Sequence, residues 1–410
     1  MFPYDASSAP DGFPSVTDPS QEAPGCAIVL VSATSKSNGL GRAISMATAL
    51  RALAPTRILA HSDGPLWRGA ATSGIPVEPF RHIHDLQRSL SHWATERQLV
   101  VWSVKPLPWS YWPVRRYLAT RQRPFLHLLD IDDLDAALSR HFRRETLHNR
   151  LIIHPAHPLH PRRIDRVVAD ALLRVTAVTG SSNALLEHLS FGAGRLSTVL
   201  PHVTPDALAA AVEQTPPTPR TGKVRLGFIG TARKHKGLTA LLDLVRAKPD
   251  LELHVLRDEL TPELSEARPR VVAHASAAEA YANTDVVALP QDSILLGARY
   301  QLPAKLLDAL HFGKPVLMTP TPVSLEHVPD AVEFVSDWQD HGSVLSSLDR
   351  ICAQLPELAI RNREIYDRRF SPTALRPRLI AFMSTLLSGS PDLESHGSQR
   401  AIKARGDASL

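Results

Sequence analysis

Residues 224–245 predict a buried strand, a glycine turn that carries cations, and a helix, and this order constrains the fold more than any other part of the sequence. Gly230 leaves room for a ligand to approach the backbone of the turn. A helix that begins near Lys236 offers free amide groups and the positive end of its dipole, and Arg233 adds formal charge. The turn therefore predicts an anion site that suits phosphate. The alternative is a solvated basic turn between a strand and a helix.

A second segment of this kind follows at residues 285–316. A short apolar strand and a polar loop come first, and Pro303 then suits the first position of a helix that ends at Gly313. Asp308 is an acid in the middle of this otherwise apolar helix. Because an unpaired carboxylate is costly in a core, we expect Asp308 either on the solvent face or turned toward a ligand hydroxyl.

The two segments together carry the pattern Gly-Thr-x-Arg-x-x-Lys-Gly, then Pro-x-Lys-x-x-Asp-Ala-x-x-x-Gly-x-Pro-Val. This pattern resembles the donor-binding domain of retaining glycosyltransferases of the B-type fold, family 4-like (glycosyltransferase group 1). The resemblance implies that Arg233 and Lys236 are the catalytic groups that hold the donor diphosphate, and that Asp308 binds the nucleotide ribose. The other donor-binding residues that it implies are Gly230, Thr231, Lys305, Gly39 and Gly41.

The same resemblance implies a reaction. A sugar moves from a UDP- or GDP-linked nucleoside diphosphate sugar to an acceptor hydroxyl, with retention, in a hexosyltransferase-type enzyme that needs neither a metal nor a cofactor. The acceptor can be a glycan, a lipid-linked group or a small molecule. Such an enzyme belongs to carbohydrate or glycoconjugate biosynthesis.

One position departs from the family pattern. The family often has two glutamates separated by seven residues, and Tyr300 stands at the first of these two places. The contact to the donor sugar hydroxyls then has to come from another group of the loop, and Arg299, Tyr300 and Gln301 are the nearest. Two alternatives to a transferase stay open. One is a nucleotide-sugar epimerase of the same architecture, and the other is a non-catalytic nucleotide-sugar-binding partner protein, which Tyr300 favours.

The first half of the chain predicts a second doubly wound sheet. A strand at residues 27–31 and a polar loop precede the helix that opens at Gly39 and Gly41, and further strands and helices alternate up to residue 200. The resemblance implies that Gly39 and Gly41 face the cleft between the two domains. The alternative is that the two glycines only form a tight turn. A third glycine and a well-placed acid are missing, which disfavours binding of NAD.

Polar side chains follow two predicted strands of this half, where open α/β sheets bind their ligands. Lys105 follows one strand, and Asp130 and Asp132 follow the next, so these three are acceptor-side candidates. Asp130-Ile131-Asp132 also matches the metal-binding triplet of the A-type glycosyltransferase fold. That fold has a single nucleotide-binding domain near the start of the chain, whereas here a phosphate loop follows residue 222. We therefore expect no metal site.

The predicted fold class is α/β, with two facing doubly wound (Rossmann-like) domains in the B-type glycosyltransferase architecture. The predicted divisions are a disordered tail at 1–24, an acceptor-side domain at 25–205, a proline-rich linker at 206–222, a nucleotide-sugar-binding domain at 223–371, a helix at 372–387 and a disordered tail at 388–410. The resemblance implies that the helix at 372–387 packs back on the first domain.

The formal net charge of +5 fits anionic ligands. Nucleic acid is disfavoured because no recognition helix, zinc finger or aromatic-basic interleaving is found. No apolar run approaches the roughly 20 residues needed to cross a bilayer, so we expect a cytoplasmic protein. Peripheral contact with the inner membrane surface stays open, with a solvated helix face over buried aromatics as its alternative. The residues that suggest this contact are Trp109, Tyr111, Trp112, Arg115, Arg116, Tyr117, Arg121 and Arg123.

Overall fold

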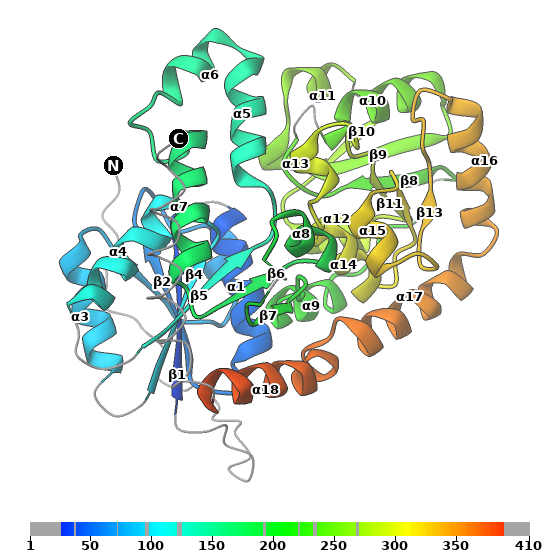
Figure 1. Cartoon of the computed structure of the whole chain (residues 1–410). Helices are drawn as coiled ribbons and strands as arrows, with labels where there is room; N and C mark the ends of the chain where they lie inside the picture. Colours follow the sequence, from blue (N-terminus) through cyan, green and yellow to red (C-terminus); the bar gives the residue numbers. More distant parts are fainter. Residues whose placement is uncertain are drawn as a thin grey trace, which may run out of the picture.

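The computed structural model describes residues 26–36, 38–71, 73–94, 98–120, 125–191, 194–219, 222–232, 236–267 and 270–388. Within them the chain forms two parallel sheets that stand side by side, and helices cover both (Figure 1). Except for Ser388, the predicted tails at 1–24 and 388–410 lie outside the described residues.

The first sheet has the strand order β3-β2-β1-β4-β5-β6-β7, and all its pairs are parallel. Every residue of β1 is buried, as expected for a strand with helices on both faces of its sheet. The strands are β1 Cys26–Ser32, β2 Thr56–His61, β3 Val77–Phe80, β4 Gln98–Val104, β5 Leu126–Ile131, β6 Ala177–Gly180 and β7 Ser197–Val199. The helices are α1 Asn38–Leu50, α2 Arg68–Ala71, α3 Ile83–Trp93, α4 Pro108–Ala119, α5 Asp135–Glu145, α6 Leu147–Ile152, α7 Pro161–Arg174 and α8 Asn183–His188.

The second sheet has the strand order β10-β9-β8-β11-β12-β13 and is also parallel. In each sheet the first strand in sequence lies inside the sheet, so the winding reverses beside it, and ligands bind at such switch points. The strands are β8 Val224–Phe228, β9 Leu251–Leu256, β10 Val271–His274, β11 Val286–Leu289, β12 Val316–Met318 and β13 Glu333–Phe334. The helices are α9 Asp206–Glu213, α10 Leu238–Ala247, the 3-10 turn η3 Arg257–Glu259, α11 Pro262–Glu266, α12 Ala277–Ala282, α13 Leu296–Arg299, α14 Ala304–His311, α15 Pro322–His327, α16 His341–Cys352, α17 Leu355–Arg369 and α18 Pro372–Ser388.

The last helix returns to the first sheet. α18 lies against α1 across the lower side of the molecule (Figure 1). Its Leu379 and Met383 belong to the same buried core as Leu30 of β1. The ring of Phe382 stacks on that of Trp102 in β4, with ring centroids 6.2 Å apart. Residues from the end of the described chain therefore complete the core of the first sheet.

The segment expected as a linker contains a helix. α9 begins at Asp206 and contacts α12, which the prolines of this segment did not lead us to predict. Its sequence Asp-Ala-Leu-Ala-Ala-Ala-Val-Glu is rich in alanine, the residue with the highest helix propensity. Asp206 places a negative charge in the first turn, where the helix dipole favours it. Pro205 precedes this helix, and three further prolines come only after its end.

The aromatic residues that suggested a membrane surface are mostly buried. Tyr111 and Tyr117 of α4 are inaccessible, and Trp112 is exposed. The guanidinium group of Arg115 lies 3.5 Å from the carboxylate of Asp170 in α7. α4 therefore packs as an ordinary surface helix over buried aromatics. Arg121 and Arg123 lie outside the described residues. No helix within the described ranges is long and apolar enough to cross a bilayer.

Candidate functional site

The glycine turn after β8 packs against the end of β11. Gly230 and Thr231 follow β8 directly, and Lys236 and Gly237 come just before α10, which begins two residues later than expected. Gly237 has φ = 73°, and a Cβ atom there would lie 1.9 Å from the carbonyl oxygen of Pro290. Only glycine fits this position without a backbone shift, because it combines a left-handed conformation with contact to another backbone segment. Arg233 lies outside the described residues.

A carboxylate binds an amide of this turn. The backbone N–H of Ala232 donates to Oε2 of Glu259 over 3.1 Å, and Glu259 ends the short turn η3 after β9. The turn thus binds an anionic oxygen of the protein itself. This agrees with a backbone shaped for anions, and it places a negative charge next to the predicted phosphate loop.

The beginning of α14 reaches the same turn. A Cβ atom at Gly230 would be 3.7 Å from Cγ of Lys305, so the two sequence motifs meet in space although they are far apart in the chain. The side chain of Lys305 is one-third exposed. Its Nζ lies 3.2 Å from Oδ2 of Asp308.

Asp308 is fully buried and held by donors from both halves of the chain. Thr204 Oγ1 donates to Oδ1 over 2.9 Å and His202 Nε2 over 3.1 Å, and both residues follow β7 of the first sheet. The hydroxyl of Tyr281 donates to Oδ2 over 3.4 Å, on the side where Lys305 lies. Asp308 is therefore not on the solvent face, which was one of the two placements expected from the sequence. Its contact with a ligand hydroxyl, the other expected placement, stays a prediction.

The ionisation of Asp308 follows from these partners. Burial alone would raise the pKa of the carboxyl group. The charges of Lys305 and His202, with hydrogen bonds from His202 and Thr204, outweigh burial and hold this pKa well below its ordinary value. Asp308 is thus a charged group at the junction between the two sheets.

The loop before α14 crosses to the first half. The ring of Tyr300 stacks on His188 of α8, with centroids 4.3 Å apart and planes inclined by 25°. In α13 a Cβ atom at Gly297 would lie 2.5 Å from Cγ of Leu138 in α5, so the two helices touch at a glycine. Tyr300, which stands where the family often has its first acid, therefore packs between the two halves. Arg299, another candidate of this loop, is exposed.

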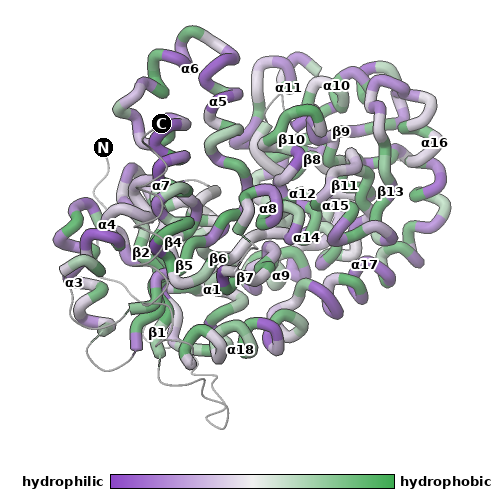
Figure 2. Tube along the Cα trace, viewed as in Figure 1, coloured by the Kyte–Doolittle hydropathy of each residue, from purple (hydrophilic) through white to green (hydrophobic). Residues whose placement is uncertain are grey.

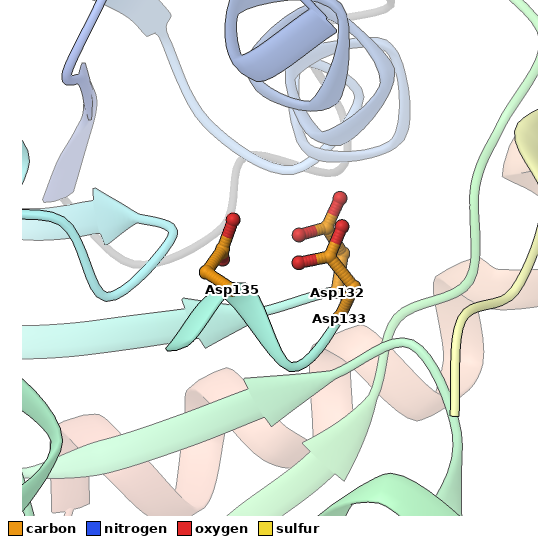
Figure 3. Close-up of side chains that lie close together, drawn as sticks. All are labelled: Asp132, Asp133 and Asp135. Carbon is orange, nitrogen blue, oxygen red and sulfur yellow. The ribbon is translucent and has the colours of Figure 1, made fainter. Parts of the chain in front are cut away.

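Four charged side chains gather at the ends of β4 and β5. Nζ of Lys105 lies 2.7 Å from Asp132 Oδ1, 3.0 Å from Asp133 Oδ2 and 3.3 Å from Asp135 Oδ1. Figure 3 shows the three carboxyl groups directed to the same side. Gln301 Nε2, from the crossing loop, donates to Asp133 Oδ2 over 3.0 Å. The structure thus places Lys105 beside Asp132, two of the acceptor-side candidates, and adds Asp133 and Asp135, which were not among the predicted site residues.

The charges of this cluster are interdependent. Burial lowers the pKa of Lys105, but the three carboxylates outweigh it and raise this pKa well above its ordinary value. Burial and the neighbouring Asp133 raise the pKa of Asp135 well above its usual range. Burial raises the pKa of Asp133, but the charge of Lys105, with the hydrogen bonds from Lys105 and Gln301, lowers it overall. Three carboxylates this close could hold a cation, and the ammonium group of Lys105 already lies among them.

Asp130 belongs to a separate buried pair. Arg42 donates from Nε and Nη2 to its two carboxylate oxygens over 2.9 and 2.7 Å, and Thr179 Oγ1 donates over 2.8 Å. Arg42 follows Gly39 and Gly41, which both lie in the first turn of α1. Asp130 is inaccessible to solvent and pairs with Arg42. Of the two predicted acceptor-side carboxylates, only Asp132 therefore pairs with Lys105.

Comparison with solved structures identifies the fold. HepE from Anabaena, solved in complex with UDP-glucose, is 15% identical, with 88% of this chain and 99% of that chain covered and a TM-score of 0.62. A glycosyltransferase from Rickettsia africae is 12% identical, with 89% and 100% covered and a TM-score of 0.56. A Listeria monocytogenes protein proposed to be a UDP-N-acetylglucosamine 2-epimerase is 11% identical, with 89% and 97% covered and a TM-score of 0.51.

These likenesses establish the architecture and not the activity, because one fold can host different reactions. The chain has the two-domain, doubly wound α/β architecture of B-type glycosyltransferases, as the sequence predicted. No family model matches the sequence, and the search of curated proteins finds no match either.

Proposed function

We propose that the protein is a glycosyltransferase that moves a sugar from a UDP- or GDP-linked sugar to an acceptor hydroxyl. The observation that carries this proposal is the meeting of the two motifs at Gly230 and Lys305, beside the switch point of the second sheet. A glycine turn, a lysine and two helix beginnings there suit a diphosphate. The binding of UDP-glucose by HepE, which has the same fold, supports this choice of donor.

The leaving diphosphate defines the roles of the cations. Arg233 and Lys236 stabilise the charge that develops on the diphosphate as the bond to the sugar breaks, and Lys305 adds a third positive group. No protein nucleophile is needed in this proposal, because the departing phosphate can take the proton of the acceptor hydroxyl. Transfer then proceeds with retention and without a cofactor, as in the family that the sequence resembles.

The acceptor side is proposed at the cluster around Lys105. Asp132 has the most exposed carboxylate of the three, with 21% of its side chain accessible, and it can accept a hydrogen bond from an acceptor hydroxyl. Gln301 links this cluster to the loop of the second half, so it lies at the junction of the two domains. We propose that the reaction needs no metal. The ammonium group of Lys105 among the three carboxylates supports this, because it supplies the positive charge that a cation would bring.

A panel of UDP- and GDP-sugars, with glycan, lipid-linked and small-molecule acceptors, tests the proposal through release of UDP or GDP. We expect release with one donor class only in the presence of an acceptor, and NMR of the product should show the anomeric configuration of the donor. A donor that changes configuration without an acceptor would identify an epimerase, which the likeness to the Listeria protein keeps as the second candidate. Donor binding in calorimetry without release under any acceptor would identify a non-catalytic binding protein.

A further inference from the structure

The helix α6 carries exposed aliphatic side chains at the outer end of α5. Leu147, Leu151 and Ile152 are 72%, 67% and 48% exposed, and none of the residues of α6 is buried. Leu159, in the loop that follows, is 43% exposed. Figure 1 shows α6 at the edge of the molecule, away from both sheets, and Figure 2 shows hydrophobic and hydrophilic residues interspersed there. Large aliphatic side chains gathered in this way indicate a contact surface.

The segment around α6 has a strongly positive net charge. Residues 140–166 contain seven arginines, no lysine and two acids, so their net charge equals the formal net charge of +5 of the whole chain. Arg144, Arg150 and Arg162 are exposed beside the aliphatic residues. No ion pair joins these three to a carboxylate within the described ranges. The surface therefore combines apolar side chains with uncompensated cations.

We propose that this surface, the α6 tip, docks on an anionic lipid bilayer. We define the α6 tip by Arg144, Leu147, Arg150, Leu151, Ile152, Leu159 and Arg162. Its leucines can enter the boundary between headgroups and acyl chains while its arginines contact lipid phosphates. A second copy of the chain is a poorer occupant, because a two-fold contact through the α6 tip would bring arginines against arginines.

Docking at the α6 tip would also set the distance of the Lys105 cluster from the bilayer. α5 begins at Asp135, which is part of the Lys105 cluster, and it ends at Glu145, next to α6. Eleven helical residues span about 16 Å, so the cluster lies roughly that far from the docked surface. If the proposed transfer is correct, this favours an acceptor that the bilayer presents. The docking itself does not depend on the reaction, and it is tested without any nucleotide sugar.

The test is flotation of the full chain with vesicles of phosphatidylcholine alone or with about 30% phosphatidylglycerol. We expect binding to the anionic vesicles at about 0.05 M salt, and loss of binding at about 0.5 M salt. Arg144→Gln/Arg150→Gln should reduce partitioning roughly 10- to 30-fold, and Leu147→Ser/Leu151→Ser roughly 10-fold. Because these side chains are exposed, thermal melting by circular dichroism should be unchanged.

Matched controls are available elsewhere on the surface. Leu173→Ser/Ile360→Ser removes aliphatic residues that are 78% and 63% exposed, and Arg81→Gln/Arg88→Gln removes exposed charges near α3. Both controls should partition like the parent. Absence of binding to anionic vesicles at low salt, equal binding to neutral vesicles, or equal losses in the controls would overturn the proposal. So would a dimer in sedimentation equilibrium that the α6-tip variants dissociate, with no vesicle binding.

Discussion

Replacing Asp308 by asparagine separates a structural role from a ligand-binding role. Asparagine keeps the size of the side chain but removes the charge that pairs with Lys305 and His202, and its amide group faces donors. Hydrogen bonds to charged groups contribute about 1.5–3 kcal/mol each, and breaking a buried pair costs about 3–5 kcal/mol. Lys305 is one-third exposed, so solvent screens part of its pairing with Asp308. We therefore take the cost of a single broken buried pair and expect Asp308→Asn to lower the free energy of unfolding by about 3–5 kcal/mol.

Urea unfolding followed by tryptophan fluorescence measures this loss, and titration calorimetry with UDP and GDP measures binding. Thr204→Val removes one hydrogen bond to the same carboxylate and should cost about 1.5–3 kcal/mol. Asp243→Asn, on the exposed face of α10, is the control and should change stability by less than about 0.5 kcal/mol. If Asp308→Asn is as stable as the parent while its nucleotide affinity falls tenfold or more, the structural reasoning is wrong and Asp308 binds the ribose.

The loss should depend on pH in a defined direction. The folded pKa of Asp308 lies below its unfolded value, so the carboxylate stabilises the protein fully above the unfolded pKa of about 3.9. This stabilisation declines as the pH falls from there through the folded pKa. The stability difference between parent and Asp308→Asn should therefore shrink as the pH falls below about 4. A difference that grows below about pH 4 would contradict the assigned ionisation.

Arg233→Ala and Lys236→Ala should each slow turnover by roughly 30-fold to several hundredfold, because each removes a charge that stabilises the leaving diphosphate. Lys234 lies between these two residues in the sequence and is expected to point to solvent, so Lys234→Ala should stay within a few-fold of the parent in the same UDP- or GDP-release assay. If all three behave alike, the turn is a generic basic patch. Glu259→Gln should strengthen binding of UDP or GDP by a few-fold in calorimetry, since it removes a carboxylate from the amide of Ala232; weaker binding would mean that Glu259 holds the turn in its binding shape. Turnover should persist in EDTA, and activity that EDTA abolishes and Mg²⁺ or Mn²⁺ restores would refute the metal-free proposal.

The architecture could be predicted from the sequence because its signal is local. Apolar strands, glycine turns and amphipathic helices alternate at the spacing of a parallel sheet, and the solved structures confirm the two-domain class. α9 was missed because the prolines on either side of it were given more weight than its alanines. Asp133 and Asp135 were not among the predicted site residues, although they lie one and three positions after Asp132, because a short acidic run does not show which carboxylates will share a lysine.

The site could be predicted only in part, because its contacts join distant residues. Nothing in the residues next to Asp308 indicates that Thr204 and His202, about a hundred positions earlier, will bind it. Tyr300 was recognised as a departure from the family, but its packing on His188 depends on how the two halves meet. The ligand roles of Lys236 and Lys305 stay predictions, which the kinetic and binding experiments address.

The return of α18 has a consequence for synthesis on the ribosome. Strands β8 to β13 and the helices up to α17 form one continuous stretch of chain, so the second lobe can complete its core once residue 370 has emerged. The first lobe is made earlier but lacks Leu379, Phe382 and Met383 until α18 has also emerged. Each such side chain contributes about 1.5–3 kcal/mol when buried. We therefore expect the lobe that is translated first to finish folding last, with the surface around Trp102 exposed to chaperones in the interval.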